Sequence, residues 1–330
     1  MNTDSSKGRV VALCGGIGGT KLALGLYRVL HPGRLTVIVN SGDDFEHLGL
    51  KICPDLDTVI YTLAGLADPK RGWGRAEETW QFMTSVGQLG GETWFQLGDR
   101  DLAMHILRTD WLRAGKCLSG FTTHAARQFG ISAEILPMTN APVRTIIETD
   151  EGNLPLQQYF VRRRCEPAVR RIRFSGAREA LPTAGIAELM ADPNLHCIII
   201  CPSNPYLSID PILAIPGIAS ALAGSQASVI AVSPIIAGKA VKGPTAKIMN
   251  ELGVTVTTEA IADHYHGLID GLVIDVSDRN DQDHVNLPVL TTRTLMDDLA
   301  DRVRLAAEVI AFADELARAS AAKVARVARR

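Results

Sequence analysis

The stretch VVALCGGIGGTKLALGL, from Val10 to Leu26, decides the fold class of this chain. Its first residues form a short apolar run, which is typical of a buried strand in a parallel sheet. Four glycines separate that run from an apolar pattern with helical spacing. Because a strand, a glycine-rich turn and a helix open many nucleotide-binding α/β folds, we predict such a fold, with this turn facing a phosphate.

The turn GGIGGTK matches neither common phosphate-binding motif. The dinucleotide motif G-x-G-x-x-G fits Gly16 and Gly18 but requires glycine where Lys21 stands, and no GKS or GKT follows as the Walker motif requires. Glycine amides before a helix approach phosphate closely, and the helix N-terminus favours an anion. A tight turn without a ligand is the alternative, but four glycines exceed what such a turn needs. The predicted phosphate cradle comprises Gly15, Gly16, Gly18, Gly19, Thr20 and Lys21.

Further short apolar runs predict the remaining strands of a parallel sheet. Four of them follow the first: Leu35–Val39, Cys197–Cys201, Ser228–Val232 and Gly271–Val276. Helical patterns at about 211–222 and 246–252 lie between the later ones, and a long helix is predicted from Leu299. Strands that alternate with helices are typical of a doubly wound sheet.

The middle of the chain has a different pattern. It is mostly helical from Thr58 to Thr123 and alternates from Glu134 to Phe174 as antiparallel strands do, with a hairpin around Glu151–Asn153. We therefore predict an α/β fold: a Rossmann-like, doubly wound, mostly parallel sheet with a large α+β insertion. We expect residues 1–330 to form a single domain, with the core at about 8–60 and 195–330 and the insertion at about 61–194.

Composition excludes several classes of protein. The formal net charge of −2 argues against a general nucleic-acid binder, so we expect no nucleic-acid partner. No apolar run approaches the roughly 20 residues that cross a bilayer, so we expect no membrane association. The polar start of the chain has no secretory signal pattern, and the six cysteines form no CxxC pair. These features predict a cytoplasmic protein with reduced thiols.

Acidic residues follow the second predicted strand. Asn40, Asp43 and Asp44 lie just past its end, and Asp55 and Asp57 come before the next helical run. Ligands of a doubly wound sheet bind outside the carboxyl ends of its strands, so these acids would face the glycine turn. Carboxylates repel a phosphate unless a hard cation bridges them, which predicts Mg²⁺ as the cofactor. Because an acid can also cap the following helix, we expect one of Asp55 and Asp57 to be a cap and the other a ligand.

Three later segments place polar groups at the same edge of the sheet. Gly98, Asp99 and Arg100 precede a helix that carries His105, where simple capping and ion pairing is an equal alternative. A hydroxyl and an amide follow the strand that begins at Cys197. A second hydroxyl and a loop rich in glycine and lysine follow the strand that begins at Ser228, and this loop either binds an anion or is exposed to solvent. The basic run from Arg162 to Phe174 is interpreted as a solvated strand face rather than a wall for an acidic substrate. The residues after the two strands are Ser203, Asn204 and Pro205, then Ser233, Gly238, Lys239, Lys242, Gly243 and Pro244.

These stretches together resemble the 2-phospho-L-lactate transferase family of coenzyme F420 biosynthesis. The motifs occur in order from Val10 to about Lys247: GGIGGTK, VNSGDD, ICPDLDTVIYTL, RGWG, LGDRDLAMHILR, PSNP, IDPILAIPG and SPIIAGKAVKGP. The resemblance implies transfer of a phospholactyl, enolpyruvyl-phosphate or phosphoglyceryl group from a guanosine diphosphate-linked three-carbon acid. The acceptor is the ribityl hydroxyl of Fo (7,8-didemethyl-8-hydroxy-5-deazariboflavin), and the products are an F420-0-type compound and GMP. It also implies Mg²⁺ and a homodimer.

The resemblance also assigns residues. Asp43 and Asp57 match acids at the metal and at Fo, and one of them would accept the proton of the attacking hydroxyl. Asp44 and Asp55 are their neighbours, and Ser203, Asn204 and Ser233 would contact the donor or the deazaflavin. Gln96 stands where many archaeal members carry a lysine or arginine, so a salt bridge to Fo is not expected there. Nothing in the sequence decides which three-carbon acid the donor carries.

Two other functions fit parts of the pattern. An NAD(P)-dependent oxidoreductase of the same fold predicts glycine at Lys21 and an acid at the end of the second strand, where Asn40 stands. A non-catalytic nucleotide or deazaflavin carrier would need the cavity but not the acids. Displacement at phosphorus depends mostly on charge neutralisation and positioning, which the acids, a cation and backbone amides can supply. We therefore expect the transferase.

Overall fold

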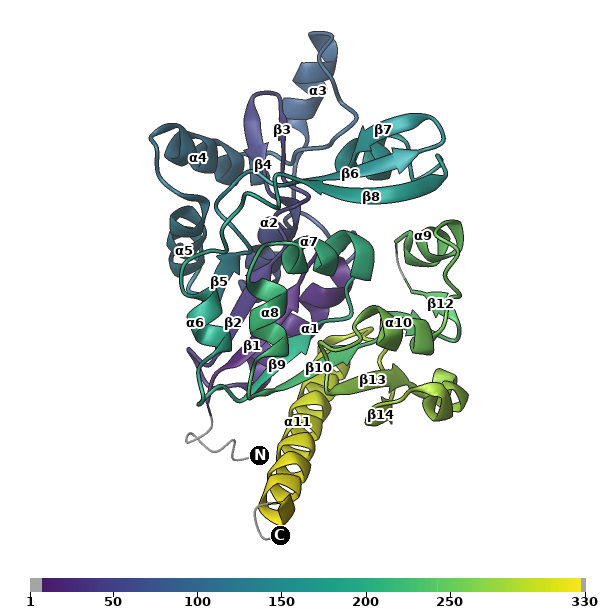
Figure 1. The fold of residues 1–330 in the computed structure, drawn as a ribbon. Helices are drawn as coiled ribbons and strands as arrows, with labels where there is room; N and C mark the ends of the chain where they lie inside the picture. Colours follow the sequence, from purple (N-terminus) through teal and green to yellow (C-terminus); the bar gives the residue numbers. More distant parts are fainter. Residues whose placement is uncertain (1–7, 242, 328–330) are drawn as a thin grey trace.

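A seven-stranded parallel sheet forms the centre of the molecule (Figure 1). The computed structural model describes residues 8–241 and 243–327, and of residues 322–327 only the backbone. The strand order across the sheet is β14-β13-β10-β9-β1-β2-β5, and every neighbouring pair is parallel. The predicted α/β class with a doubly wound parallel sheet is therefore confirmed. The strands are β1 (Val10–Cys14), β2 (Leu35–Val39), β5 (Glu134–Pro137), β9 (Cys197–Ile200), β10 (Ser228–Val232), β13 (Gly271–Asp275) and β14 (Val289–Thr292).

The strand order reverses at β1. This strand pairs with β2 on one side and with β9 on the other, although β9 comes more than 180 residues later. Chain connections leave such a point in opposite directions, which opens a crevice outside the carboxyl ends of the strands. The glycine turn after β1 and the Ser203 turn after β9 therefore lie at the same crevice.

Helices cover both faces of the sheet, and each face has its own apolar core. Alternate β1 residues separate the two cores, with Val10 and Ala12 in one and Val11 and Leu13 in the other. The first core packs against α1 (Gly16–Val29), α2 (Pro54–Leu63), α5 (Leu118–Gln128) and α11 (Leu299–Val327). The second packs against α6 (Ile186–Met190), α7 (Asp210–Leu213), α8 (Ile218–Ala223), α9 (Thr245–Glu251) and α10 (Thr258–His264).

The inserted elements gather at the carboxyl-end side of the sheet (Figure 1). They include two antiparallel units and two helices, and the predicted hairpin is confirmed, with Thr149 paired to Gly152. Their bounds are β3 (Phe45–His47), β4 (Leu50–Ile52), α3 (Gln81–Gln88), α4 (Asp101–Arg113), β6 (Arg144–Thr149), β7 (Gly152–Pro155) and β8 (Val169–Ser175). Shorter elements are the π-helices η1 (Gln158–Arg162) and η2 (Pro205–Ile209), the 3-10 helix η3 (Val276–His284), β11 (Ile235–Ile236) and β12 (Lys239–Ala240).

Two sequence-based expectations about elements are wrong. Glu134–Pro137 is not antiparallel: it is β5, an edge strand of the central sheet that pairs in parallel with β2. Four residues are too few to show an alternating pattern. The helix α5, which precedes the strand, belongs to the crossover connection that a parallel pair requires. The single helix predicted at about 211–222 is two helices, because the chain turns at Gly217, whose φ of +92° favours glycine. No helix within the described residues is long and apolar enough to cross a membrane.

Candidate active site

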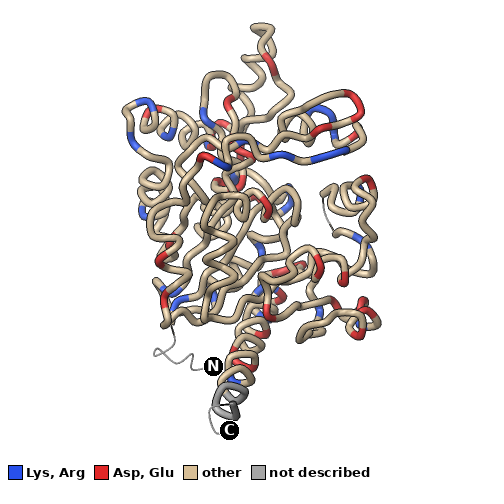
Figure 2. The backbone as a smooth tube through the Cα atoms, in the orientation of Figure 1, with Lys and Arg blue, Asp and Glu red and all other residues tan. Residues whose placement is uncertain are grey.

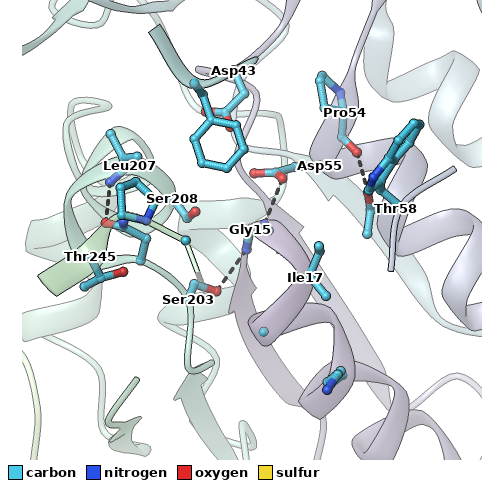
Figure 3. A pocket seen from close by; sticks show the side chains of 18 of the residues that line it. Gly15, Ile17, Asp43, Pro54, Asp55, Thr58, Ser203, Leu207, Ser208 and Thr245 are labelled. Atoms are coloured by element: carbon cyan, nitrogen blue, oxygen red, sulfur yellow. Dashed lines mark hydrogen bonds between the residues drawn. The ribbon is translucent and has the colours of Figure 1, made fainter. Parts of the chain in front are cut away.

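A cavity of about 550 Å³ lies in the crevice at the carboxyl ends of the strands. Its walls come from segments far apart in the sequence: the turn after β1, the start of α2, the inserted loops around Trp73 and Trp94, and the turns after β9 and β10. Figure 3 shows Gly15 of the first of these segments, Pro54 of α2 and Ser203 after β9 around the cavity. The predicted residues that line it are Gly15, Gly16, Gly18, Lys21, Asp43, Asp55, Asp57, Gln96, Ser203, Asn204, Ser233, Gly243 and Pro244. Lys242 lies outside the described residues.

Other predicted site residues do not line the cavity: Gly19, Thr20, Asn40, Asp44, Gly98, Asp99, Arg100, Pro205, Gly238 and Lys239. Several of them support lining residues from behind. The Thr20 hydroxyl donates to the Gly16 carbonyl at 2.7 Å. A Cβ on Gly19 would lie 2.1 Å from the Ser203 Oγ, so this glycine permits α1 to approach the turn after β9. Asp44 is buried and pairs with the Lys51 Nζ at 3.3 Å.

The segment Gly98 to Arg100 has a local structural role. The Asp99 carboxylate accepts from the backbone N–H groups of Gln81 and Phe82, both at 3.0 Å, and so holds the start of α3. Arg100 pairs with Glu77 at 3.2 Å. The alternative of capping and ion pairing thus describes this segment. The cavity is reached instead by Asp101 and His105, further along the same motif, which were not among the predicted site residues.

Protein side chains already bind two amides of the glycine turn (Figure 3). The Gly15 N–H donates to the Ser203 Oγ at 3.2 Å, and the Gly16 N–H donates to the Asp55 Oδ1 at 2.7 Å. The first four N–H groups of a helix have no intrahelical partner, and in α1 the third and fourth belong to Ile17 and Gly18. Both residues line the cavity. These two amides are therefore the ones placed for a phosphate.

One asparagine holds two carboxylates together. The Asn40 Nδ2 donates to the Asp43 Oδ1 at 2.7 Å and to the Asp55 Oδ2 at 3.0 Å, while the Asn40 Oδ1 accepts from the Gly42 N–H at 2.7 Å. Burial, with the nearby charge of Asp55, raises the pKa of Asp43 well above its usual range. Burial also raises the pKa of Asp55 to about 6, against the opposing hydrogen bonds from Gly16 and Asn40.

This pair of carboxylates fits a hard divalent cation. Both side chains line the cavity and offer oxygen atoms, which Mg²⁺ prefers. Within the described residues, neither Asp43 nor Asp55 forms an ion pair with a lysine, arginine or histidine. Their pKa values are raised mainly because they are buried without a positive charge beside them. A bound cation would supply that charge and lower both pKa values.

Asp57 is neutralised by a buried arginine. The Arg108 Nη1 donates to the Asp57 Oδ1 at 2.6 Å and its Nη2 to the Oδ2 at 3.0 Å, and Arg108 is only 1% exposed. Burial alone would lower the pKa of Arg108, but Asp57, Cys53 and Asp44 together outweigh burial and raise that pKa. Both carboxylate oxygens thus have a cationic partner, which does not fit the metal-ligand role expected of Asp57. Neither Asp55 nor Asp57 caps α2, whose N-cap residue Cys53 forms no side-chain capping bond.

A second acidic group lies beside this pair. Ligand atoms of Asp57, Asp101 and His105 all lie within 4.8 Å of one another, a spacing that could hold a metal ion. However, the Arg108 guanidinium contacts two of the three, since its Nη2 also lies 2.8 Å from the His105 Nδ1. Because a guanidinium already contacts two of the three members, this group is less suited to hold a metal ion than Asp43 and Asp55.

Aromatic side chains form part of the cavity wall. Tyr61, Trp73, Trp94, Phe95 and Phe160 line it, and Trp73 is 43% exposed although it is large and apolar. Such a surface is suited to a planar ring system. Its one signal in the sequence was the group of tryptophans in the inserted segment. The basic residues of β8, seen as a blue band in Figure 2, do not line the cavity, in agreement with the solvated-face interpretation.

The fold and the cavity define a Rossmann-like α/β protein with a site at the switch point of its sheet. The family model for 2-phospho-L-lactate transferase CofD matches residues 10–311. The chain belongs to this family, which confirms the predicted resemblance, and it is a transferase of coenzyme F420 biosynthesis. Membership also argues against the oxidoreductase alternative, as does Asn40, whose amide is fully buried between carboxylates.

Comparisons with individual proteins agree with this assignment. The chain is 39% identical over 318 residues to a phosphoenolpyruvate transferase of Kitasatospora aureofaciens, covering 93% of this chain and 98% of that protein. It is 37% identical to a phosphoenolpyruvate transferase of Streptomyces coelicolor, covering 93% and 99%. A crystal structure of a UPF0052 family protein from Bacillus halodurans superposes with a TM-score of 0.63 at 15% identity, covering 93% and 99%. That likeness supports the fold alone.

Proposed function

We propose that this protein transfers a phosphorylated three-carbon acid from a guanosine diphosphate-linked donor to Fo. The terminal ribityl hydroxyl of Fo attacks the phosphorus nearer the three-carbon acid. A new oxygen–phosphorus bond forms, the bond to the GMP oxygen breaks, and the products are a phosphodiester of Fo and GMP. The observation that carries the proposal is the uncompensated pair Asp43 and Asp55, next to the open N-terminus of α1 in a single cavity.

The residues of the chain divide the work of this reaction. The Ile17 and Gly18 amides would bind phosphate oxygens, because the other two amides of the first turn are taken by Ser203 and Asp55. Asp43 and Asp55 would hold Mg²⁺, which when bound would neutralise charge on the diphosphate. The aromatic wall would carry a ring system of a substrate.

Asp43 is the proposed acceptor of the hydroxyl proton. Of the two acids expected for this role, Asp57 is held by Arg108 through both oxygens. Asp43 lines the cavity, and its Oδ2 accepts no hydrogen bond from the described residues, so this oxygen would be open to the substrate hydroxyl.

We further propose enolpyruvyl phosphate as the transferred group, because the similar proteins cited above are named phosphoenolpyruvate transferases. The test supplies the purified protein with Fo, Mg²⁺ and equal amounts of three guanosine diphosphate-linked donors, carrying enolpyruvate, lactate or glycerate. Mass spectrometry identifies the Fo product, and chromatography measures GMP. The enolpyruvyl product should dominate. Dominance of another product would contradict the donor assignment, and absence of GMP with all three donors would contradict the transfer itself.

The non-catalytic carrier is tested with the same assay. Asp43→Asn removes a charge without changing the size of the side chain. A carrier would show no turnover in either protein, whereas a transferase should lose GMP release in the variant and keep its fold, as circular dichroism would show.

A further inference from the structure

A chain of buried polar side chains reaches the cavity beside its aromatic wall. It runs from Arg108 through His105 to Asp101, all on α4, and Tyr61 of α2 joins at its end. The transfer mechanism proposed above gives Arg108, His105 and Asp101 no role, and it uses Tyr61 only as part of the aromatic wall. Asp101 faces the cavity with 14% of its side chain exposed, whereas Tyr61, His105 and Arg108 are almost fully buried.

The tautomer of His105 follows from its neighbours. The Arg108 Nη2 lies 2.8 Å from the His105 Nδ1, and a guanidinium has donors only, so the Nδ1 accepts. The proton of the neutral imidazole is therefore on the Nε2, which lies 3.3 Å from the Asp101 Oδ2. This contact does not meet standard hydrogen-bond geometry, so the Nε2–H orients Asp101 mainly by electrostatic attraction.

Asp101 is thereby held as an ionised acceptor. The Tyr61 hydroxyl donates to its Oδ1 at 2.5 Å, and the His105 Nε2–H faces its Oδ2. Burial alone would raise the pKa of Asp101, but His105, Tyr61 and Arg108 together outweigh burial and lower that pKa. An ionised carboxylate donates nothing, and each of its oxygens can accept a further hydrogen bond. Asp101 therefore presents to the cavity a hydrogen-bond acceptor whose orientation is fixed by its neighbours.

We propose that Asp101 accepts a hydrogen bond from the ring N–H of a substrate heterocycle, with Tyr61 and His105 as positioning residues. The inference rests on the proposed function, whose two substrates each carry such a group: the pyrimidinedione N–H of the deazaflavin and the N–H and amino group of guanine. Asp101 and the aromatic wall line the same cavity, so a planar ring bound there has a charged acceptor available to its N–H. A hydrogen bond to a charged acceptor is stronger than one between neutral groups, so it discriminates between rings.

The experiment measures binding without turnover. Fo binding is followed by its fluorescence and GDP binding by calorimetry, both with Mg²⁺, for the unaltered protein and for Asp101→Asn, Tyr61→Phe and the control Asp110→Asn. Asp110 is an exposed acid at the other end of α4. We expect Asp101→Asn to raise the Kd of one ligand about 10- to 100-fold and to leave the other within about twofold. Tyr61→Phe should weaken the same ligand by about threefold, and Asp110→Asn should weaken neither.

The outcomes separate the two sources of the ring N–H. Weakening of Fo alone identifies the deazaflavin, and weakening of GDP alone identifies guanine. A derivative of that ligand methylated at the ring nitrogen should then bind the unaltered protein and Asp101→Asn equally. Unchanged binding of both ligands, or equal weakening of both, would overturn the proposal, and Tyr61→Phe still tests it if Asp101→Asn does not fold. If the unaltered protein binds neither ligand, both this proposal and the proposed function are refuted. If it binds the ligands but catalyses no transfer, only the proposed function is refuted.

Discussion

Two pairs of acids in one cavity differ in how their charge is balanced. Asp43 and Asp55 share the amide of Asn40, and their pKa values are raised, mainly by burial. Asp57 and Asp101 lie against Arg108 and His105, and the pKa of Asp101 is lowered. The first pair is short of positive charge and suits a cation. In the second pair, Asp57 is balanced by the Arg108 guanidinium, and Asp101 is held as an ionised acceptor that suits a neutral donor group.

The difference arises from the faces of one helix. Asp55 and Asp57 are two residues apart at the start of α2, and such positions point to different sides of a helix. Asp55 reaches the Gly16 amide of α1, while Asp57 reaches Arg108 of α4. The chemistry of an acid in this motif therefore depends on what packs against its side of the helix, not on the motif itself.

The largest effect should follow from changing the uncompensated pair. Asp55→Asn and Asp43→Asn should each lower kcat/KM about 10²- to 10³-fold, because the diphosphate loses charge neutralisation in the transition state. GMP release at saturating Mg²⁺ measures this. Asp263→Asn, on the exposed surface of α10, is the matched control and should keep full activity. Less than tenfold loss in both variants would show that this pair does not serve the reaction.

Breaking the ion pair between Arg108 and Asp57 should instead lower the stability of the fold. Arg108→Met leaves Asp57 buried without its cation, so the free energy of unfolding should fall by about 3 kcal/mol. Arg113→Met, an exposed change on the same helix, should stay within about 0.5 kcal/mol. Chemical denaturation of both variants gives the comparison. A loss below about 1 kcal/mol for Arg108→Met would mean that the buried pair adds little to the fold.

The effect of Mg²⁺ on stability should depend on pH. A carboxyl group whose pKa is raised on folding favours the folded state while protonated, and this contribution is lost as the pH rises through the folded-state value, about 6 for Asp55. Without divalent cations the melting temperature should therefore fall between pH 5 and 7.5. Mg²⁺ at ten times its Kd should restore about 1.4 kcal/mol at pH 7.5 and less at pH 5.

Thermal melts in EDTA and in Mg²⁺ at both pH values test this expectation. Asp55→Asn serves as the internal control, since it removes the titrating group but keeps an oxygen for the Gly16 N–H. Equal gains from Mg²⁺ at the two pH values, or an undiminished gain in Asp55→Asn, would place the cation elsewhere.

The smallest effect is expected at Gln96, a lining residue outside both pairs. Its Nε2 donates to the Thr93 carbonyl at 2.8 Å, and its side chain is exposed. Gln96→Ala should change the KM for Fo less than about threefold, the size of a neutral exposed hydrogen bond. Steady-state kinetics with varied Fo would show this. A tenfold rise in KM would instead indicate that the Gln96 side chain contacts Fo.

The order of elements was predictable because it depends on local patterns. Apolar runs closed by glycine or proline placed β1, β2, β9, β10 and β13, and the glycine turn placed the switch point. The two edge strands were not predicted correctly: β5 was assigned to an antiparallel sheet, and β14 was not identified. Edge strands are short and partly exposed, so their pairing depends on neighbours more than on their own residues.

The sequence by itself determined the sheet, its crevice and the presence of acids at its rim, since strand periodicity and the direction of parallel strands follow from local residue types. Only the tertiary structure decided the partner of each acid. Asp57 and Arg108 are 51 positions apart and meet because α4 packs against β4, the strand that directly precedes α2. A carboxylate has the same formula in every sequence, and its role depends on the burial, charge and hydrogen bonds that the folded chain places around it.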